Sequence, residues 1–153
     1  MTSNLYIDSI LNRLEGFRGV YAANNLPIRI FSDQKAPQFA VVNTKPISES
    51  DGHWLLFAQY NDHLELFDSL AYPLCLLHQN IRKIFLRENF KTFQKNNKII
   101  QPLNSRFCGF YVIARIISIV EGQSLASHLE IYSSDLSLNS TICSKYIEET
   151  CNK

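Results

Sequence analysis

The sequence predicts an α+β fold in which a mainly antiparallel central sheet packs against helices. Two observations support this class. Apolar runs of strand length occupy the middle of the chain, whereas apolar residues at helical spacing dominate its beginning and its second half. The chain has 153 residues, of which 46% are hydrophobic and 19% charged, and this balance suits one domain with a sizeable core. We therefore treat residues 1–153 as a single domain and assign no role to the tail after about residue 124.

The first part of the chain predicts one helix followed by strands. Residues 5–14 carry apolar side chains at helical spacing, and Gly16 follows as a stop signal. A loop then leads to a short strand expected at residues 28–31. Residues 38–43 predict a further strand because β-branched residues are concentrated there and Pro46 breaks the pattern soon afterwards.

The second half of the chain predicts two helices separated by a short strand. Residues 74–93 alternate apolar and basic side chains in the manner of an amphipathic helix, and residues 98–100 are a strand candidate. Residues 107–120 are apolar on nearly all sides, which predicts a central, buried helix. One or two short helices are expected after residue 125.

Charge and cysteine content exclude several functional classes. A formal net charge of +1 gives no electrostatic reason for strong binding to nucleic acid or to an anionic membrane. The N-terminus has no basic, apolar signal segment, and no apolar run approaches the length of a membrane span. None of the four cysteines forms a C-x-x-C pair. We expect an intracellular protein with reduced thiols and with no metal or cofactor.

Cys108 is the candidate nucleophile because it lies where a polar loop ends and the apolar helix begins. The first N–H groups of a helix have no intrahelical acceptor, and the helix dipole is positive at this end. Both effects favour thiolate over thiol, so a cysteine in this place can become a nucleophile near neutral pH.

The other candidate catalytic groups come from a predicted β-hairpin and from the loop before the helix. Residues 53–60 and 64–67 are two apolar runs separated by a polar turn. His53 opens the first strand and Asp68 follows the second, so an antiparallel hairpin brings them together, and the carboxylate can orient the imidazole. Gln101 can donate its amide N–H to a developing oxyanion, together with the backbone N–H at the helix start.

Five segments of the chain resemble, in the same order, the adenovirus maturation protease (adenain) and its relatives encoded by polinton-type elements and virophages. The most specific runs from Gln101 to Gly109 and reads Gln-Pro-Leu-Asn-Ser-Arg-Phe-Cys-Gly. The others are residues 19–27, 39–44, 52–54 and 66–69.

The resemblance implies a cysteine endopeptidase that cleaves virion precursor proteins during particle maturation, in a fold shared with SUMO-deconjugating proteases. It carries over His53 as general base, Asp68 as orienting carboxylate, Cys108 as nucleophile and Gln101 as oxyanion donor. Trp54 is expected to line the substrate groove. The expected substrates are capsid and core precursors with small residues at the cleavage site. The expected location is the virion and the interior of the infected cell, in its nucleus or cytoplasm.

Two departures from the family pattern concern activation. Adenovirus enzymes carry a peptide activator on a second cysteine shortly before the nucleophile, whereas here Phe90 stands near that place and no cysteine lies between Cys75 and Cys108. A peptide activator, if used, is therefore not attached by that disulfide. Adenovirus enzymes are also stimulated by DNA. For this chain a net charge of +1 argues against stimulation by DNA, although Lys91, Lys95 and Lys98 form a local basic cluster.

Other interpretations stay open at this stage. The same triad serves isopeptidases that remove ubiquitin-like modifiers, and a non-catalytic virion module could keep the fold. A cysteine taken alone is usually a small core residue, and this is our interpretation of Cys75, Cys143 and Cys151. We expect the remaining histidines, His63, His78 and His128, to be solvated.

Overall fold

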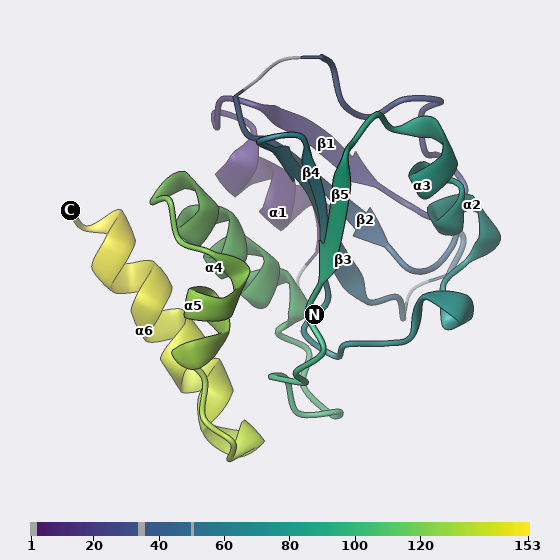
Figure 1. The fold of residues 1–153 in the computed structure, drawn as a ribbon. Coiled ribbons are helices and arrows are strands. Elements are labelled where there is room, and N and C mark those ends of the chain that lie inside the picture. The colour runs from purple at the N-terminus through teal and green to yellow at the C-terminus, as the bar shows by residue number, and fades with distance from the viewer. Residues whose placement is uncertain (1–2, 34–35, 50) are drawn as a thin grey trace.

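The computed structural model describes residues 3–33, 36–49 and 51–153, and within these ranges five strands form one mixed sheet in the order β1-β2-β3-β4-β5 (Figure 1). The strands are β1 (Phe17–Tyr21), β2 (Gln38–Asn43), β3 (Trp54–Tyr60), β4 (His63–Phe67) and β5 (Thr92–Lys95). The helices are α1 (Asn4–Leu11), α2 (Gln79–Arg82), α3 (Ile84–Arg87), α4 (Cys108–Val120), α5 (Leu125–Glu130) and α6 (Asn139–Cys151), with 3-10 turns at η1 (Leu74–Leu76) and η2 (Leu136–Leu138).

The predicted α+β class is confirmed, but the sheet is mixed rather than mainly antiparallel. The central pairs β2–β3 and β3–β4 are antiparallel. The outer pairs β1–β2 and β4–β5 are parallel. A parallel neighbour needs a longer connection than a hairpin does. The loop between β1 and β2 is one such connection. The segment with η1, α2 and α3 between β4 and β5 is the other.

Both faces of the central strands are buried, which explains their nearly continuous apolar sequence. Alternate residues such as Phe39, Val41 and Leu56 face a core shared with α1 and α4. Their neighbours in the strands, such as Val42 and Phe57, face a second core under α2, α3 and the segment that follows β1. Figure 1 shows α1 and α4 on one side of the sheet and α2 and α3 on the other.

The predicted hairpin is confirmed and its turn is two residues long. Tyr60 pairs with His63 across the turn. Asn61 and Asp62 have φ angles of 51° and 61°, the left-handed conformation that a type I′ turn requires at both central positions and that Asn and Asp tolerate. This turn fixes the register that brings the start of β3 beside the end of β4.

The strand expected at residues 28–31 is wrong, and β1 was not predicted. Ile30 and Phe31 are buried, but their backbone N–H groups donate to the carboxylate of Glu88 at 2.5 and 3.3 Å instead of to a strand. Strand β1 shows no alternation of buried and exposed residues, and its pairing with β2 is irregular near Gly19. A sequence pattern of period two is therefore absent where the edge strand forms.

The single helix expected at residues 74–93 and the strand at 98–100 are also wrong. The first segment breaks into η1, α2 and α3, since Leu77 is extended after η1 and the His78 side chain caps α2. Glu88 ends α3 in an extended conformation, and the chain then enters β5. The contact of the Glu88 carboxylate with residues 30 and 31 is a tertiary interaction that helical periodicity does not reveal.

The central helix is confirmed as α4, and the tail forms α5, η2 and α6. Helix α6 packs against α4 on the side away from the sheet (Figure 1). Cys143 and Tyr132 from this tail belong to the same core as α4. None of the helices in the described ranges is long and apolar enough to cross a membrane.

Candidate active site

The structure brings His53 and Asp68 into direct contact. His53 directly precedes β3 and Asp68 directly follows β4, so the hairpin register places them side by side. Nε2 of His53 lies 2.6 Å from Oδ1 of Asp68, and only 11% of the His53 side chain and 1% of the Asp68 side chain are exposed. A short contact between two shielded groups orients the imidazole and leaves Nδ1 as the nitrogen that can exchange a proton with a thiol.

Asp68 is itself held by main-chain donors. The N–H of Leu70 donates to Oδ1 at 2.9 Å, and the N–H of Tyr72 donates to Oδ2 at 2.8 Å. The side chain of Asn96 bonds both backbone groups of Asp68, at 2.9 Å from its N–H and 2.6 Å from its carbonyl oxygen. These bonds fix the carboxylate and stabilise its charged form.

Cys108 lies at the start of α4, and its thiol is hydrogen-bonded to the side chain of His53. The backbone N–H groups of Trp54 and Gly109 also point to the sulfur. The residue before the helix, Phe107, makes no side-chain cap. The first N–H groups of α4 are therefore not used by a capping side chain and stay available to the sulfur and to a bound oxygen.

The three groups are electrostatically coupled. Burial alone would raise the pKa of the Cys108 thiol, but the hydrogen bond and charge of His53 outweigh it, and the pKa lies below its ordinary value. Burial alone would lower the pKa of His53, but Asp68 and Cys108 raise it to about 9. Burial alone would raise the pKa of Asp68, but its bonds to His53 and to the main chain lower it. Together these shifts favour a thiolate–imidazolium pair at neutral pH.

Gln101 is buried, and its amide has a fixed orientation. Its Oε1 accepts a hydrogen bond from Oγ of Ser69 at 2.6 Å, and its Nε2 donates to the carbonyl of Ser105 at 2.9 Å. The carbonyl of Ser69 also accepts the backbone N–H groups of Ile100 and Gln101. Because Nε2 carries two protons, one N–H remains without an acceptor among the described residues.

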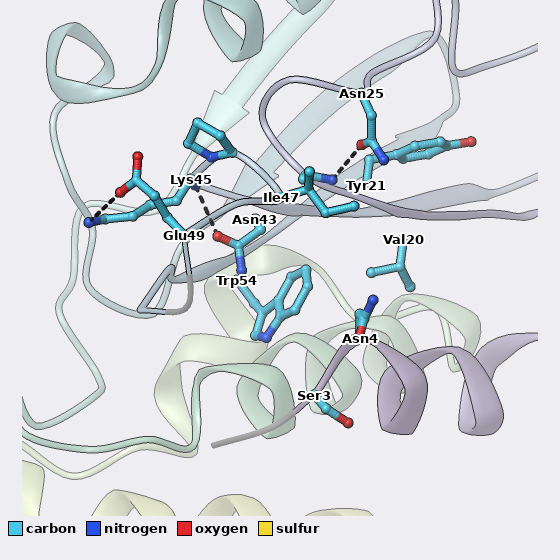
Figure 2. Close-up of a pocket in the computed structure, with 12 residues that line it drawn as sticks. Ser3, Asn4, Val20, Tyr21, Asn25, Asn43, Lys45, Ile47, Glu49 and Trp54 are labelled. Atoms are coloured by element: carbon cyan, nitrogen blue, oxygen red, sulfur yellow. Dashed lines mark hydrogen bonds and ion pairs between the residues drawn. The ribbon is translucent and has the colours of Figure 1, made fainter.

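Trp54 lines a pocket of about 260 Å³ beside the triad, together with residues from the start of α1, the end of β1 and the end of β2. Figure 2 shows its indole ring lying between Asn43 and the start of α1. Trp54 directly follows His53 in the chain and contributes to the pocket lining, whereas its contact with a substrate stays a prediction.

Several residues that touch the triad had no role in our sequence interpretation. Ser69 and Asn96 bond Gln101 and Asp68 respectively, and the ring of Tyr72 packs edge-on against the ring of His53 at 5.9 Å. Ser69 lies within one of the quoted segments, so its position next to Asp68 was a usable signal. For Asn96 and Tyr72 the contacts are tertiary and carry no sequence signature.

The other cysteines and histidines differ partly from the sequence interpretation. All four cysteines are free, and Cys143 is buried as expected, but Cys75 and Cys151 are exposed. His128 is fully buried rather than solvated. Among the described side chains, no group of three His, Cys, Asp or Glu residues is arranged to hold a metal ion.

The basic cluster considered for nucleic acid is tied to the protein itself. The ammonium group of Lys91 lies 2.9 Å from a carboxylate oxygen of Asp62. Lys95 bonds the carbonyl of Asn96, and Lys98 bonds the carbonyls of residues 129 and 132.

No protein-family model and no curated protein matches this chain.

Proposed function

We propose that this protein is a cysteine endopeptidase in which Cys108 is the nucleophile, His53 the general base and acid, and Asp68 the group that orients His53. The observation that supports the proposal best is the continuous hydrogen-bonded line from the Asp68 carboxylate through the His53 ring to the Cys108 thiol. A nucleophile, a base and an orienting third group in this order are the requirement for acyl transfer through a thioester.

The chemistry follows from the charge state of the pair. The Cys108 thiolate attacks the scissile carbonyl carbon and forms a C–S bond, and the carbonyl oxygen becomes an oxyanion. The free N–H of Gln101 and the backbone N–H of Cys108 stabilise that oxyanion. The His53 imidazolium protonates the leaving amine as the C–N bond breaks. A water molecule, deprotonated by His53, then cleaves the thioester and releases the acid.

The substrates we propose are virion precursor proteins, cleaved next to small residues during particle maturation. This part rests on the resemblance of residues 101–109 and the other four segments to adenain-type enzymes. The burial of Cys108, which is 5% exposed, is consistent with a substrate chain that must present little bulk at the scissile bond.

The test compares the wild-type protein with Cys108→Ala on the capsid precursors of its own genome and on fluorogenic peptides with glycine at the cleavage site. We expect new termini and peptide hydrolysis with the wild type. We expect at least about a thousandfold loss with the variant, because the oxyanion donors alone accelerate little without a nucleophile. Comparable turnover by both proteins would refute the proposal. Hydrolysis confined to conjugates of ubiquitin-like modifiers would instead identify an isopeptidase.

A further inference from the structure

The pocket beside Trp54 is lined by three asparagines that come from separate elements. Asn4 opens α1, Asn25 lies in the loop after β1, and Asn43 ends β2 (Figure 2). Each side-chain oxygen already accepts a backbone N–H: Asn4 from Leu5 at 2.9 Å, Asn25 from Ala22 at 2.6 Å and Asn43 from Lys45 at 2.9 Å. These three bonds fix which end of each amide the protein itself uses.

The three amide groups still have hydrogen-bond donors that the protein itself does not use. Their Nδ2 atoms have no acceptor among the described residues, so each brings N–H groups to the pocket lining. The charged groups of the lining, Lys45 and Glu49, pair with each other at 3.0 Å and are about half exposed at the rim. A bound group that accepts hydrogen bonds would therefore be complemented, whereas a bound cation would face the N–H groups of all three amides.

The apolar part of the lining and the volume of the pocket limit which chemical groups can bind there. Val20 and Trp54 contribute apolar surface, which suits methylene groups. The volume of about 260 Å³ is below the roughly 300–1,000 Å³ of pockets that enclose a drug-sized ligand. The pocket accordingly suits one side chain with an apolar stem and an acceptor at its end.

The pocket is within reach of a peptide held at Cys108. The backbone N–H of Trp54 points to the Cys108 sulfur, and Asn43 is the register partner of Trp54 in the neighbouring strand. Neighbouring strands lie about 4.8 Å apart, and an extended chain advances about 3.3 Å per residue. A side chain that enters the pocket thus belongs to a residue within about four positions of the scissile bond.

We propose that this pocket is a specificity subsite for a carboxamide side chain, glutamine above all, in the polypeptide substrate. The inference rests on the proposed function and adds its substrate preference. The carboxamide oxygen accepts from the asparagine N–H groups, and its own NH₂ reaches the carboxylate of Glu49 or water. A glutamate or aspartate finds no unpaired cation in the lining, because Lys45 is already paired with Glu49. The N–H groups of a bound lysine or arginine would face the N–H groups of the three asparagines, and donors do not bond donors.

The test profiles cleavage of a peptide library that varies all positions near the bond, with new termini mapped on both sides. We expect glutamine and asparagine to be enriched at one position. In matched peptides we expect kcat/KM to be roughly tenfold higher with glutamine than with leucine there, the factor given by one or two net hydrogen bonds.

The decisive variant is Asn4→Asp combined with Asn25→Asp. Both residues are exposed, and aspartate keeps the oxygen that accepts the backbone N–H while it replaces the donor by an acceptor. Aspartate in the first turn of α1 also suits the helix dipole. We expect the preference to change from glutamine to lysine or arginine at the same position. The control is Asn24→Asp, compared with Asn25→Asp alone, because Asn24 is exposed and its replacement adds one negative charge in the same loop without lining the pocket.

The outcomes separate the subsite from the function. Cleavage that depends on Cys108 but shows no carboxamide preference, or a preference unchanged in the double variant, overturns the subsite and leaves the endopeptidase standing. A preference changed equally by Asn24→Asp also overturns the subsite, because simple charge would then explain it. Absence of any Cys108-dependent cleavage overturns the proposed function and the subsite with it.

Discussion

The lowered pKa of the Cys108 thiol depends on His53, which lies far away in the sequence. Its sulfur is buried, and burial opposes the thiolate, so the lowered pKa of the thiol comes from His53 and from two backbone N–H groups. The imidazole in turn owes its pKa of about 9 to Asp68 and to the sulfur. The charged form of the imidazole therefore stabilises the charged form of the thiol, and the reverse also holds.

The coupling predicts how the alkylation of Cys108 by iodoacetamide depends on pH. In the wild type, the lowered pKa of Cys108 should give a larger thiolate fraction at pH 6 than an ordinary thiol has, and alkylation should decline as the pH falls through that pKa. In His53→Ala the burial effect dominates, and the pKa should rise. The rate at pH 6 should then fall by at least about tenfold, the effect of one pKa unit. Peptide mapping by mass spectrometry separates Cys108 from the other three cysteines. Superimposable pH profiles of the two proteins would contradict the coupling.

Ser69 predicts a positioning effect on Gln101. Ser69→Ala removes the hydroxyl that holds Oε1 of Gln101, so the amide loses its orientation. We expect kcat to fall about tenfold, less than the roughly hundredfold expected for Gln101→Ala. Alkylation of Cys108 should be unchanged in both. A double-mutant cycle checks this role. If Ser69 acted only on the structure in general, the variant with both Ser69→Ala and Gln101→Ala would have a lower kcat than Gln101→Ala alone.

Where the position of a site residue depends on local structure alone, it could be predicted from the sequence. His53 and Asp68 lie at the two ends of a hairpin, and Cys108 begins an apolar helix, so two apolar runs around a polar turn, together with helical spacing, predict where they lie. The contact between the hairpin and the helix start, and the bonds from Asn96 and Tyr72, depend on how distant elements pack. Local patterns contain no information on such packing.

At the scale of elements, the central strands were predictable and the edge strands were not. Strand β2 has the predicted bounds and β3 differs by one residue, because strands buried on both faces concentrate apolar and β-branched residues. Strands β1 and β5 lie at the edges, are only partly buried, and pair in parallel with β2 and β4. Their formation depends on a neighbour that arrives from far along the chain.

Helix α4 is held to the sheet by an ion pair that helical spacing alone would not suggest. Arg115 donates two hydrogen bonds to Glu65 of β4, at 2.8 and 2.7 Å, and both side chains are fully buried. Tyr60 and Gln94 also bond the Glu65 carboxylate, so both charges have polar partners. This contact fixes α4 along its axis, and Cys108 lies two turns before Arg115 on the same helix.

The whole molecule carries an acid-sensitive contact between its tail and its sheet. His128 of α5 is buried against the rings of Phe67, Tyr132 and Tyr146, and among the described residues its Nδ1 is the buried side-chain atom without a hydrogen-bond partner. Burial, followed by the charge of Arg115, lowers the pKa of His128 to about 3. The folded protein thus holds His128 neutral.

This contact predicts that stability falls with acidification. The folded pKa lies below the unfolded one near 6.5, so the contribution of His128 is present above about pH 6.5 and is lost as the pH falls toward 3. Between pH 7 and pH 5 the loss is about 2 kcal/mol. The variant His128→Phe should lose this part of the pH dependence, measured by urea unfolding at both values. Equal losses in wild type and variant would show that His128 does not titrate in this window.

Asn139, near the end of the chain, is tied to the segment that carries Gln101. Its buried side chain donates to the carbonyl of Ile100 at 2.9 Å and to that of Ser133 at 3.0 Å. The tail is therefore joined to the segment that positions Gln101, so a change in the tail can reach the candidate oxyanion donor through the carbonyl of Ile100.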